Sequence, residues 1–344
     1  MITNQQLERY KEIMCFTPTV PAPRRGAAIF SRPGPRTWDE FTGQARAKGQ
    51  LQASIHSAQS RHTRLEHVLI AAGQYGTGKS ALARLVAAEM EVGIIELSGQ
   101  VSIDQARPIL RGMEDRDILF LDEVHAMVTH GKANAEWLLH LLEDGRLLSA
   151  AGAEKMPDIT VIAATTDAGK LPETILNRFP IRSVLDPYTP EQATEIALYM
   201  AGNLRFGSET PPLTARTAVL VADAANGNPR DMRALLTILR DAYYGGLAEV
   251  DENGDYDLST MLEWAGLTAD GLTKIAQDYL TVMMVDFSGK AGEKTIASAL
   301  GEPGPLRHVE RLLLQKGFIA VTATGRQMTK RGVTRATQLL GGAA

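Results

Sequence analysis

Short apolar runs alternate with longer amphipathic segments through residues 36–187. The runs have the length of buried strands, and the segments between them have helical periodicity. Strands and helices in alternation predict an α/β fold, in which helices cover both faces of a parallel sheet. The apolar runs are His67–Ala71, Gly93–Leu97, Ile118–Leu121, Ile159–Ala163 and Ile181–Leu185.

Residues 188–250 carry helical periodicity without strand-like runs, so we expect an all-helical domain there. The start of one helix can be predicted, because Asn228 can cap it and Pro229 suits its first turn. Its apolar residues fall on one face: Met232, Leu235, Leu236, Leu239 and Tyr243.

The last part of the chain, residues 258–344, follows an acidic loop at Glu249–Asp257. Helices followed by a β-hairpin predict a winged helix, a variant of the helix-turn-helix. The helical patterns are Gly271–Val285, Lys294–Leu300 and Pro305–Lys316, and the strands Phe318–Thr322 and Gln327–Lys330 flank a turn at Ala323–Arg326. At the other end, the Pro- and Arg-rich residues 1–35 are predicted to form an arm or linker.

The composition is that of a globular protein, with 44% hydrophobic and 22% charged residues in a chain of 344. This length suits two or three domains. There is no run of about 18 apolar residues, and the N-terminus lacks the apolar centre of a signal peptide. The single cysteine, Cys15, fits a reducing compartment. We therefore expect a cytoplasmic protein without a membrane partner.

The charge pattern points to a local basic surface. A net charge of −4 argues against a protein that coats nucleic acid over its whole surface. No acidic side chain follows Glu310, whereas six basic ones do, and such a face suits either nucleic acid or plain solvation. These residues are Arg311, Lys316, Arg326, Lys330, Arg331 and Arg335.

A phosphate-binding loop is predicted at residues 73–80, between an apolar run and a helical pattern. The string Gly73-Gln74-Tyr75-Gly76-Thr77-Gly78-Lys79-Ser80 satisfies the pattern G-x-x-x-x-G-K-[ST]. Glycines let backbone N–H groups surround phosphates, the lysine reaches the β- and γ-phosphates, and the serine hydroxyl can bind Mg²⁺. The motif therefore predicts ATP as ligand.

Further candidates lie where later predicted strands end. Asp122 and Glu123 end the run Ile118–Leu121, where an aspartate can hold the Mg²⁺ complex and a glutamate can act as general base. Thr165 or Thr166 can hydrogen-bond the attacking water or the γ-phosphate. Arg178 and Arg230 suit charge-stabilising roles.

Together these features resemble the AAA+ ATPases, and among them the RuvB family of Holliday-junction branch-migration motors. The resemblance runs from about Arg32 to the C-terminus. Its most telling strings are Arg32-Pro33 with Phe41-Thr42-Gly43-Gln44, Leu65-Glu66-His67-Val68-Leu69, Ala87-Ala88-Glu89-Met90, Leu119-Phe120-Leu121-Asp122-Glu123-Val124-His125, Ala163-Ala164-Thr165-Thr166-Asp167-Ala168-Gly169, Gly227-Asn228-Pro229-Arg230 and Leu314-Gln315-Lys316-Gly317-Phe318 with Gly325-Arg326.

The resemblance implies a role for each matching residue. Lys79, Ser80, Asp122 and Glu123 match the nucleotide, magnesium and hydrolysis positions. Thr165 matches the γ-phosphate sensor, and Arg178 matches an arginine finger that reaches a neighbouring subunit in a ring, which in this family is a hexamer. Tyr188 lies where the family packs a tyrosine near adenine, and Arg230 matches the lid arginine. The expected DNA contacts in the winged helix are Arg307, Arg311, Arg326, Lys330 and Arg331.

The chain also departs from the family pattern. The phosphate loop has Gln74-Tyr75 and Ser80 where the family has two prolines and a threonine. One of two wing arginines is missing, and Ala126-Met127 replaces an arginine and a leucine. Most consequential is the segment Gly145–Asp158, which is much shorter than the family's hairpin that docks onto RuvA and lacks its long strand pattern. The change is either harmless shortening or a sign that the protein uses a different partner.

Three functions remain open on sequence alone. The first is a ring-forming motor that spends ATP to translocate double-stranded or branched DNA. The second is an AAA+ loader that places another protein, such as a replicative helicase, on DNA. The C-terminal winged helix favours the motor and the short segment favours the loader. The third is a DNA-binding regulator with a vestigial ATPase, and the intact Lys79, Asp122, Glu123 and Arg178 argue against it.

Overall fold

The computed structural model describes residues 34–99, 101–129, 132–149, 152–208 and 210–341. It divides the chain into two compact units, Met1–Pro187 and Tyr188–Ala344, which are described separately. Of the arm predicted at residues 1–35, all but the last two residues lie outside the described ranges. No helix in those ranges combines the length and the apolar character that crossing a bilayer requires.

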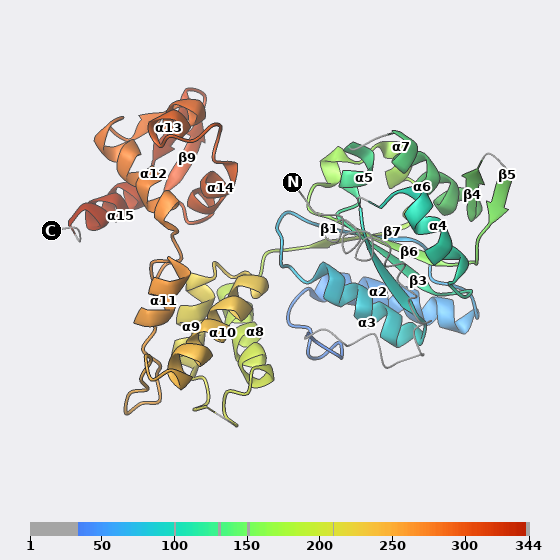
Figure 1. Cartoon of the computed structure of the whole chain (residues 1–344), viewed down its shortest axis with the longest axis horizontal. Coiled ribbons are helices and arrows are strands. Elements are labelled where there is room, and N and C mark those ends of the chain that lie inside the picture. The colour runs from blue at the N-terminus through green and yellow to red at the C-terminus, as the bar shows by residue number, and fades with distance from the viewer. Residues whose placement is uncertain (1–33, 100, 130–131, 150–151, 209, 342–344) are drawn as a thin grey trace, which may run out of the picture. The chain divides into compact units, whose positions relative to one another are not determined.

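The first unit is built on a parallel sheet of five strands in the order β2-β3-β6-β1-β7 (Figure 1). The predicted α/β fold is thereby confirmed, and each apolar run lies within two residues of an observed strand. The strands are β1 (Val68–Ala72), β2 (Ile94–Ser98), β3 (Ile118–Asp122), β6 (Thr160–Thr165) and β7 (Ile181–Leu185).

Both faces of this sheet are buried, which explains why its strands read as apolar runs and not as alternating patterns. Val68 and Ile70 pack with α2 and α3 on one face, whereas Leu69 packs with α4–α7 on the other. Figure 1 shows the helices in these two layers. Their bounds are α2 (Ala45–Ser60), α3 (Lys79–Met90), α4 (Ile103–Arg111), α5 (His125–Thr129), α6 (Lys132–Asp144) and α7 (Glu173–Leu176), with a short 3-10 turn, η1, at Ala168–Lys170.

The segment after α6 forms a short hairpin, in place of the long strand pattern that we found missing from the sequence. Strands β4 (Arg146–Ser149) and β5 (Gly152–Lys155) pair antiparallel, and the Met156 N–H donates to the Gly145 carbonyl at 2.8 Å. Glu154 holds β5 against α4, because its carboxylate accepts from Arg107 at 3.2 Å and from Arg111 at 2.6 Å. Strands of four residues are too short to show a period in the sequence.

The second unit begins with a helical core whose end we predicted wrongly. Its helices are α8 (Pro190–Asn203), α9 (Ala215–Ala224), α10 (Pro229–Tyr244) and α11 (Ser259–Ala265). We expected this domain to end near residue 250 and the next to start at 258. Met261 of α11 is fully buried in the core that α8–α10 form, and Leu267 packs against it. The helical domain therefore extends through the acidic loop to about residue 267.

The acidic loop belongs to the helical domain, because its polar side chains form hydrogen bonds and an ion pair with residues of that domain. The Tyr256 side chain is buried, and its hydroxyl donates to the Pro211 carbonyl at 2.7 Å. Asp255 accepts a hydrogen bond from Thr214 and forms an ion pair of 3.3 Å with Arg216. A Gly-containing acidic sequence is typical of a linker, but these contacts pin it to α9.

The predicted winged helix is confirmed at residues 272–341. A separate core joins its helices to a three-stranded antiparallel sheet in the order β8-β10-β9. The elements are α12 (Lys274–Val285), β8 (Lys290–Ala291), α13 (Glu293–Ala299), α14 (Arg307–Gln315), β9 (Ile319–Thr322), β10 (Gly325–Met328) and α15 (Lys330–Gly341).

The hairpin of this domain is tighter than we predicted. Gly325 already pairs with Thr322, so the turn consists of Ala323 and Thr324 only. Gly325 allows this pairing, because a Cβ there would lie 2.6 Å from the Ala291 carbonyl oxygen. Lys330 begins α15 and is not part of the second strand.

Arg326, which we expected at the wing as a DNA contact, is 19% exposed and forms ion pairs with residues of its own domain. Its guanidinium donates to Glu310 at 2.7 and 2.9 Å and also to Glu293. Glu310 is 3% exposed and accepts a further bond of 2.8 Å from the Tyr279 hydroxyl. A buried carboxylate needs a partner charge, so the structure uses Arg326 to neutralise Glu310. The nearby carboxylates also raise the pKa of Arg326.

His67, just before β1, is a second buried ionisable group. Its Nδ1 accepts from the Val161 N–H at 3.0 Å, which requires a neutral ring. Burial, and secondly the charge of Arg64, lower the pKa of His67 to about 3.

We expect the stability of the first unit to fall as the pH drops below about 6.5, the ordinary pKa of histidine. The folded state resists protonation of His67 and the unfolded chain does not, so this contribution is complete above pH 6.5 and declines toward pH 3. His67→Asn keeps an acceptor but cannot titrate, and should flatten the dependence of the urea unfolding midpoint on pH. His56→Asn, on the exposed side of α2, should leave it unchanged.

We expect Arg326→Met to lower the unfolding free energy of the winged helix by about 2–3 kcal/mol, because Glu310 would stay buried without its partner charge. Arg307→Met, an exposed position on α14, should change it by less than about 0.5 kcal/mol. Urea unfolding of the whole chain measures both. Equal stability of the two variants would show that the Arg326 ion pair is not structural.

Candidate functional site

The predicted phosphate loop connects β1 to α3. Gly76 and Gly78 have φ angles of 78° and 95°, where a side chain would be strained. Gly78 is also the N-cap of α3, and no side chain caps this helix. The helix N-terminus and the glycine backbone thus present amide groups to an anion, which is the arrangement that phosphate groups require.

Lys79 points from this loop toward β3. Its side chain is 6% exposed, and its Nζ lies 3.4 Å from the Gln74 carbonyl and 3.9 Å from Glu123 Oε1. The Tyr75 ring, at a position where the family has a proline, lies 5.8 Å from the ammonium group. The amine is therefore held between the loop and the end of β3, where phosphates bound by the loop would meet it.

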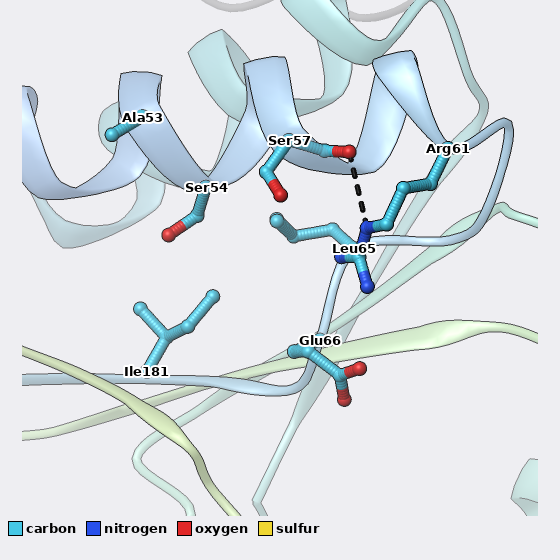
Figure 2. Close-up of a pocket in the computed structure, with 7 residues that line it drawn as sticks. All are labelled: Ala53, Ser54, Ser57, Arg61, Leu65, Glu66 and Ile181. Carbon is cyan, nitrogen blue, oxygen red and sulfur yellow. Dashed lines mark hydrogen bonds between the residues drawn. The ribbon is translucent and has the colours of Figure 1, made fainter.

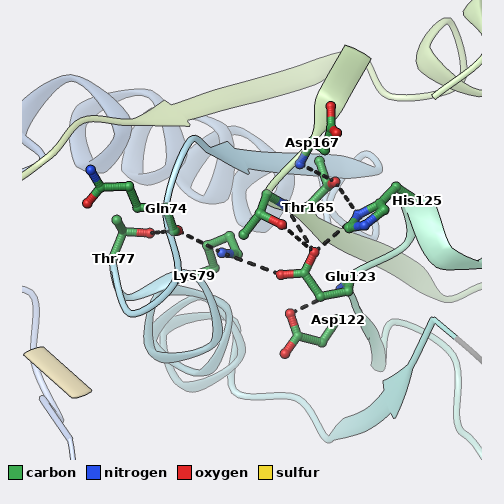
Figure 3. Close-up of polar contacts among 9 residues, drawn as sticks. Gln74, Thr77, Lys79, Asp122, Glu123, His125, Thr165 and Asp167 are labelled. Carbon is green, nitrogen blue, oxygen red and sulfur yellow. Dashed lines mark hydrogen bonds and ion pairs between the residues drawn. The ribbon is translucent and has the colours of Figure 1, made fainter. Parts of the chain in front are cut away.

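The sheet order brings the other predicted residues to the same edge. Strand β6 pairs with β1 on one side and with β3 on the other, and all three run parallel. Their carboxyl ends therefore lie together. Figure 3 shows Lys79, at the start of α3, facing Glu123 at the end of β3, while Thr165 at the end of β6 contacts His125. These residues were predicted from the phosphate-loop motif, the strand ends and the family resemblance.

Glu123 is held by Thr166, which we had named only as the alternative to Thr165 at the end of this strand. Glu123 Oε2 accepts from the Thr166 backbone N–H at 3.1 Å and from the Thr166 hydroxyl at 2.9 Å. The hydroxyl of Thr165, expected to sense the γ-phosphate, is fully buried and accepts from the Asp167 N–H at 3.0 Å. The contact with Glu123 thus comes from Thr166.

His125 also belongs to this cluster, and sequence reasoning missed it. Its Nδ1 lies 2.9 Å from Thr165 Oγ1 and 3.1 Å from Glu123 Oε2 (Figure 3). The signal was present in the string Asp122-Glu123-Val124-His125, because a histidine two residues after the glutamate can return to the same edge of the sheet.

The residues expected to hold Mg²⁺ fit a site of the P-loop kind. Asp122 ends β3, and its Oδ1 accepts from the Glu123 N–H at 3.1 Å. Ser80 is the second residue of α3, directly after Lys79. Throughout the described ranges, no group of three or more His, Cys, Asp or Glu side chains forms a metal site. Mg²⁺ is commonly held by one or two protein oxygens together with phosphates and water, so Ser80 and Asp122 are the residues that would hold it.

Arg178 lies after α7 and contacts α6. Its Nη2 donates to Glu143 Oε1 at 2.6 Å, and the side chain is 36% exposed. Its Nε is buried and has no hydrogen-bond partner among the described residues. Glu143 lies two residues before Gly145, where the hairpin begins, so the arginine is tied to the base of the hairpin.

Tyr188 and Arg230 belong to the second unit. Tyr188 is half-buried and packs against the helical core. Arg230 is exposed in the first turn of α10, and its backbone N–H donates to Asn228 Oδ1 at 3.0 Å, so Asn228 caps the helix as predicted. Their expected roles toward nucleotide stay predictions.

Most of the basic residues predicted to touch DNA are exposed. Arg307 and Arg311 are on α14, and Lys330 and Arg331 are in the first turn of α15. The Arg331 guanidinium lies 5.3 Å from the centre of the Phe318 ring, which restrains the side chain while leaving its charge at the surface. Arg326 differs, because its guanidinium forms ion pairs with Glu310 and Glu293.

A hollow of about 290 Å³ lies beside α2 in the first unit (Figure 2). Leu65 and Glu66, which line it, precede β1, whereas the phosphate loop follows β1. The hollow is therefore at the amino end of this strand, away from the edge where ligands of parallel sheets bind. Its lining is Ala53, Ser54, Ser57, Arg61, Leu65, Glu66 and Ile181, which includes none of the predicted site residues.

Comparison with known proteins agrees with this geometry. Residues 33–185 match the model of the Holliday junction DNA helicase RuvB P-loop domain, and residues 269–336 match the RuvB C-terminal winged helix domain. The Holliday junction branch migration complex subunit RuvB of Kosmotoga olearia is 34% identical over 314 residues, which are 86% of this chain and 87% of that protein. The chain belongs to the RuvB family.

Other RuvB proteins give the same result. The RuvB of Myxococcus xanthus is 34% identical over 313 residues, covering 86% of this chain and 87% of its own. The Thermotoga maritima RuvB Holliday junction branch migration motor superimposes with a TM-score of 0.72 at 28% identity, over 88% of this chain and 97% of the solved chain. RuvB similarity thus spans both units, and the P-loop domain makes this chain a nucleotide-binding protein.

We expect Thr166→Val to lower the ATP turnover rate by roughly 10-fold or more, because Glu123 loses a hydrogen bond to its charged form. Thr165→Val should lower turnover less, but should cost about 1–2 kcal/mol of stability because the half-buried Asp167 N–H loses its acceptor. Steady-state turnover and urea unfolding separate the two effects. The opposite ranking in turnover would show that the contact between Thr166 and Glu123 does not control the rate.

Proposed function

We propose that this chain is an ATP-driven motor that translocates branched DNA, the activity named in its RuvB relatives. The observation that carries the proposal is the combination of a complete nucleotide edge with a winged helix in one chain similar to branch-migration subunits over 86% of its length. A loader shares the nucleotide edge, but the similarity to these motors extends through the C-terminal domain.

In the proposed reaction, the phosphate loop and Lys79 hold the phosphates of ATP. Ser80 and Asp122 hold Mg²⁺, which neutralises phosphate charge when bound. Glu123 accepts a proton from the attacking water as general base, and Thr166 orients its carboxylate. Thr165 stays a predicted γ-phosphate sensor.

We propose that the active form is a ring, a hexamer as expected of the family. Arg178 would stabilise the charge on the γ-phosphate in the neighbouring subunit, while Tyr188 and Arg230 would contact the nucleotide of their own subunit. The Glu143 ion pair supports this proposal, because it presents Arg178 at the surface of its own subunit. A cytoplasmic location stays an expectation.

DNA would be held by sequence-independent contacts from the winged helix. Arg307, Arg311, Lys330 and Arg331 are exposed and can reach backbone phosphates without reading bases, which suits a motor that slides along a duplex. We propose no DNA contact for Arg326, since its charge stabilises the domain from within.

The second candidate, an AAA+ loader, is favoured by one observation. The hairpin expected to dock a RuvA-type partner is only two four-residue strands, and Glu154 ties it back to α4. A protein that uses a different partner, for example a replicative helicase, would need no longer hairpin.

Branch migration of a synthetic four-way junction tests the proposal, with and without a junction-binding partner. Wild-type protein should dissociate the junction in the presence of ATP, and Glu123→Gln should not, because it lacks the base. Hydrolysis without junction movement, together with ATP-dependent transfer of a helicase onto DNA, would favour the loader.

We expect Arg178→Ala to reduce turnover by at least about 10²-fold while binding of an ATP analogue is retained. Mixing it with Lys79→Ala should restore part of the activity, because an intact phosphate loop then meets an intact arginine across a subunit boundary. Turnover by each variant alone and by the mixture measures this. No restoration, or full activity of Arg178→Ala, would contradict action in trans.

A further inference from the structure

His125 lies between the two strand ends that carry the proposed chemistry. It is the first residue of α5, and its side chain is 16% exposed. Figure 3 shows its ring between Glu123 and Thr165, with Nδ1 turned toward both. The distances are 3.1 Å to Glu123 Oε2 and 2.9 Å to Thr165 Oγ1, so one ring nitrogen serves the end of β3 and the end of β6.

The proton positions follow from the chemistry of the partners. An ionised carboxylate can only accept hydrogen bonds, so Nδ1 approaches Glu123 favourably only when it carries a proton. Thr165 Oγ1 already accepts from the Asp167 N–H and can accept a second bond. We therefore assign the Nδ1–H form to His125, which shares this proton between the carboxylate and the hydroxyl.

The two oxygens of Glu123 have different surroundings. Oε2 meets three donor groups: the Thr166 N–H, the Thr166 hydroxyl and His125 Nδ1. Oε1 faces Lys79 at 3.9 Å, on the side of the phosphate loop. One oxygen is thus used for anchoring, and the other is directed to the nucleotide side.

We propose that His125 is a positioning residue for ATP hydrolysis, which fixes the Glu123 carboxylate so that Oε1 receives the proton of the attacking water. This inference rests on the proposed general-base role of Glu123. The imidazole anchors Oε2 jointly with Thr166 and links it to Thr165. Thr166 and His125 thus both connect the end of β6 to the base.

Three variants of His125 test this role, because they differ in whether and where the new side chain places an N–H donor. The amide of His125→Asn can place an N–H near the site of Nδ1, whereas the longer His125→Gln carries its amide near the site of Nε2. His125→Leu fills the space without any donor. His56→Leu, exposed on α2, is the matched control for loss of a histidine and should keep wild-type turnover.

We expect His125→Leu and His125→Gln to lower kcat by roughly 10-fold or more, since a misplaced base slows proton transfer. His125→Asn should retain kcat within about 3-fold, and all three should bind a non-hydrolysable ATP analogue within about 2-fold of wild type, because His125 acts on the base and not on the phosphates. In a Glu123→Gln background, His125→Leu should cause no further loss in single-turnover rate, because the two residues act as a unit.

The outcomes separate this inference from the proposed function. Wild-type turnover by Glu123→Gln would overturn the general-base role itself. Loss of turnover in Glu123→Gln with wild-type kcat in His125→Leu would overturn only the role of His125. Equal impairment of the Asn and Gln variants, or losses of His125→Leu and Glu123→Gln that multiply, would show that the ring merely fills space. If His125→Leu does not fold, the Asn and Gln pair decides.

Discussion

The nucleotide edge depends on the parallel pairing of β6 with β1 and β3. The register places Ile70 beside Ala164 and Leu121 beside Ala163, so the three strands end at one edge within a residue or two of each other. Both faces of the sheet are buried, and a slip of one residue would exchange the faces of every side chain. Packing of each face against its own layer of helices therefore sets the register, and the register places the phosphate loop, the carboxylates and the threonines together.

A local backbone constraint completes this edge. Glu123 has a φ of 53°, a conformation that costs a non-glycine residue about 1–2 kcal/mol. Immediately after it, the Val124 N–H donates to the Ala164 carbonyl at 2.9 Å, so the chain turns without leaving β6. The turn returns the side chains of Glu123 and His125 toward Thr165 and Thr166. The strained residue, Glu123, is thus the proposed general base, and the hydrogen bond between Val124 and β6 keeps its backbone in this conformation.

Ion pairs decide which charged residues stay at the surface. Arg326 neutralises the buried Glu310, and Glu154 holds the short hairpin against α4. Arg178, by contrast, is held by Glu143 near the base of that hairpin and remains one-third exposed. The sequence does not distinguish these three roles: Arg326 stabilises a core, Glu154 fastens a hairpin and Arg178 is presented outward.

The sequence by itself determined the parallel sheet, the winged helix, the phosphate loop and the Asp122-Glu123 pair, because each depends on residues close together in the chain. Strand-length apolar runs and the glycine-rich motif are local patterns, which can be recognised without knowing any tertiary contact. Only the tertiary structure decided that Thr166 and not Thr165 holds Glu123, that His125 joins them, that Arg326 is internal and that the helical domain extends to about residue 267. Those outcomes depend on contacts between residues far apart in the chain, for example Glu123 with Thr166, which are 43 residues apart. They also depend on the buried carboxylate of Glu310, which requires the opposite charge of Arg326.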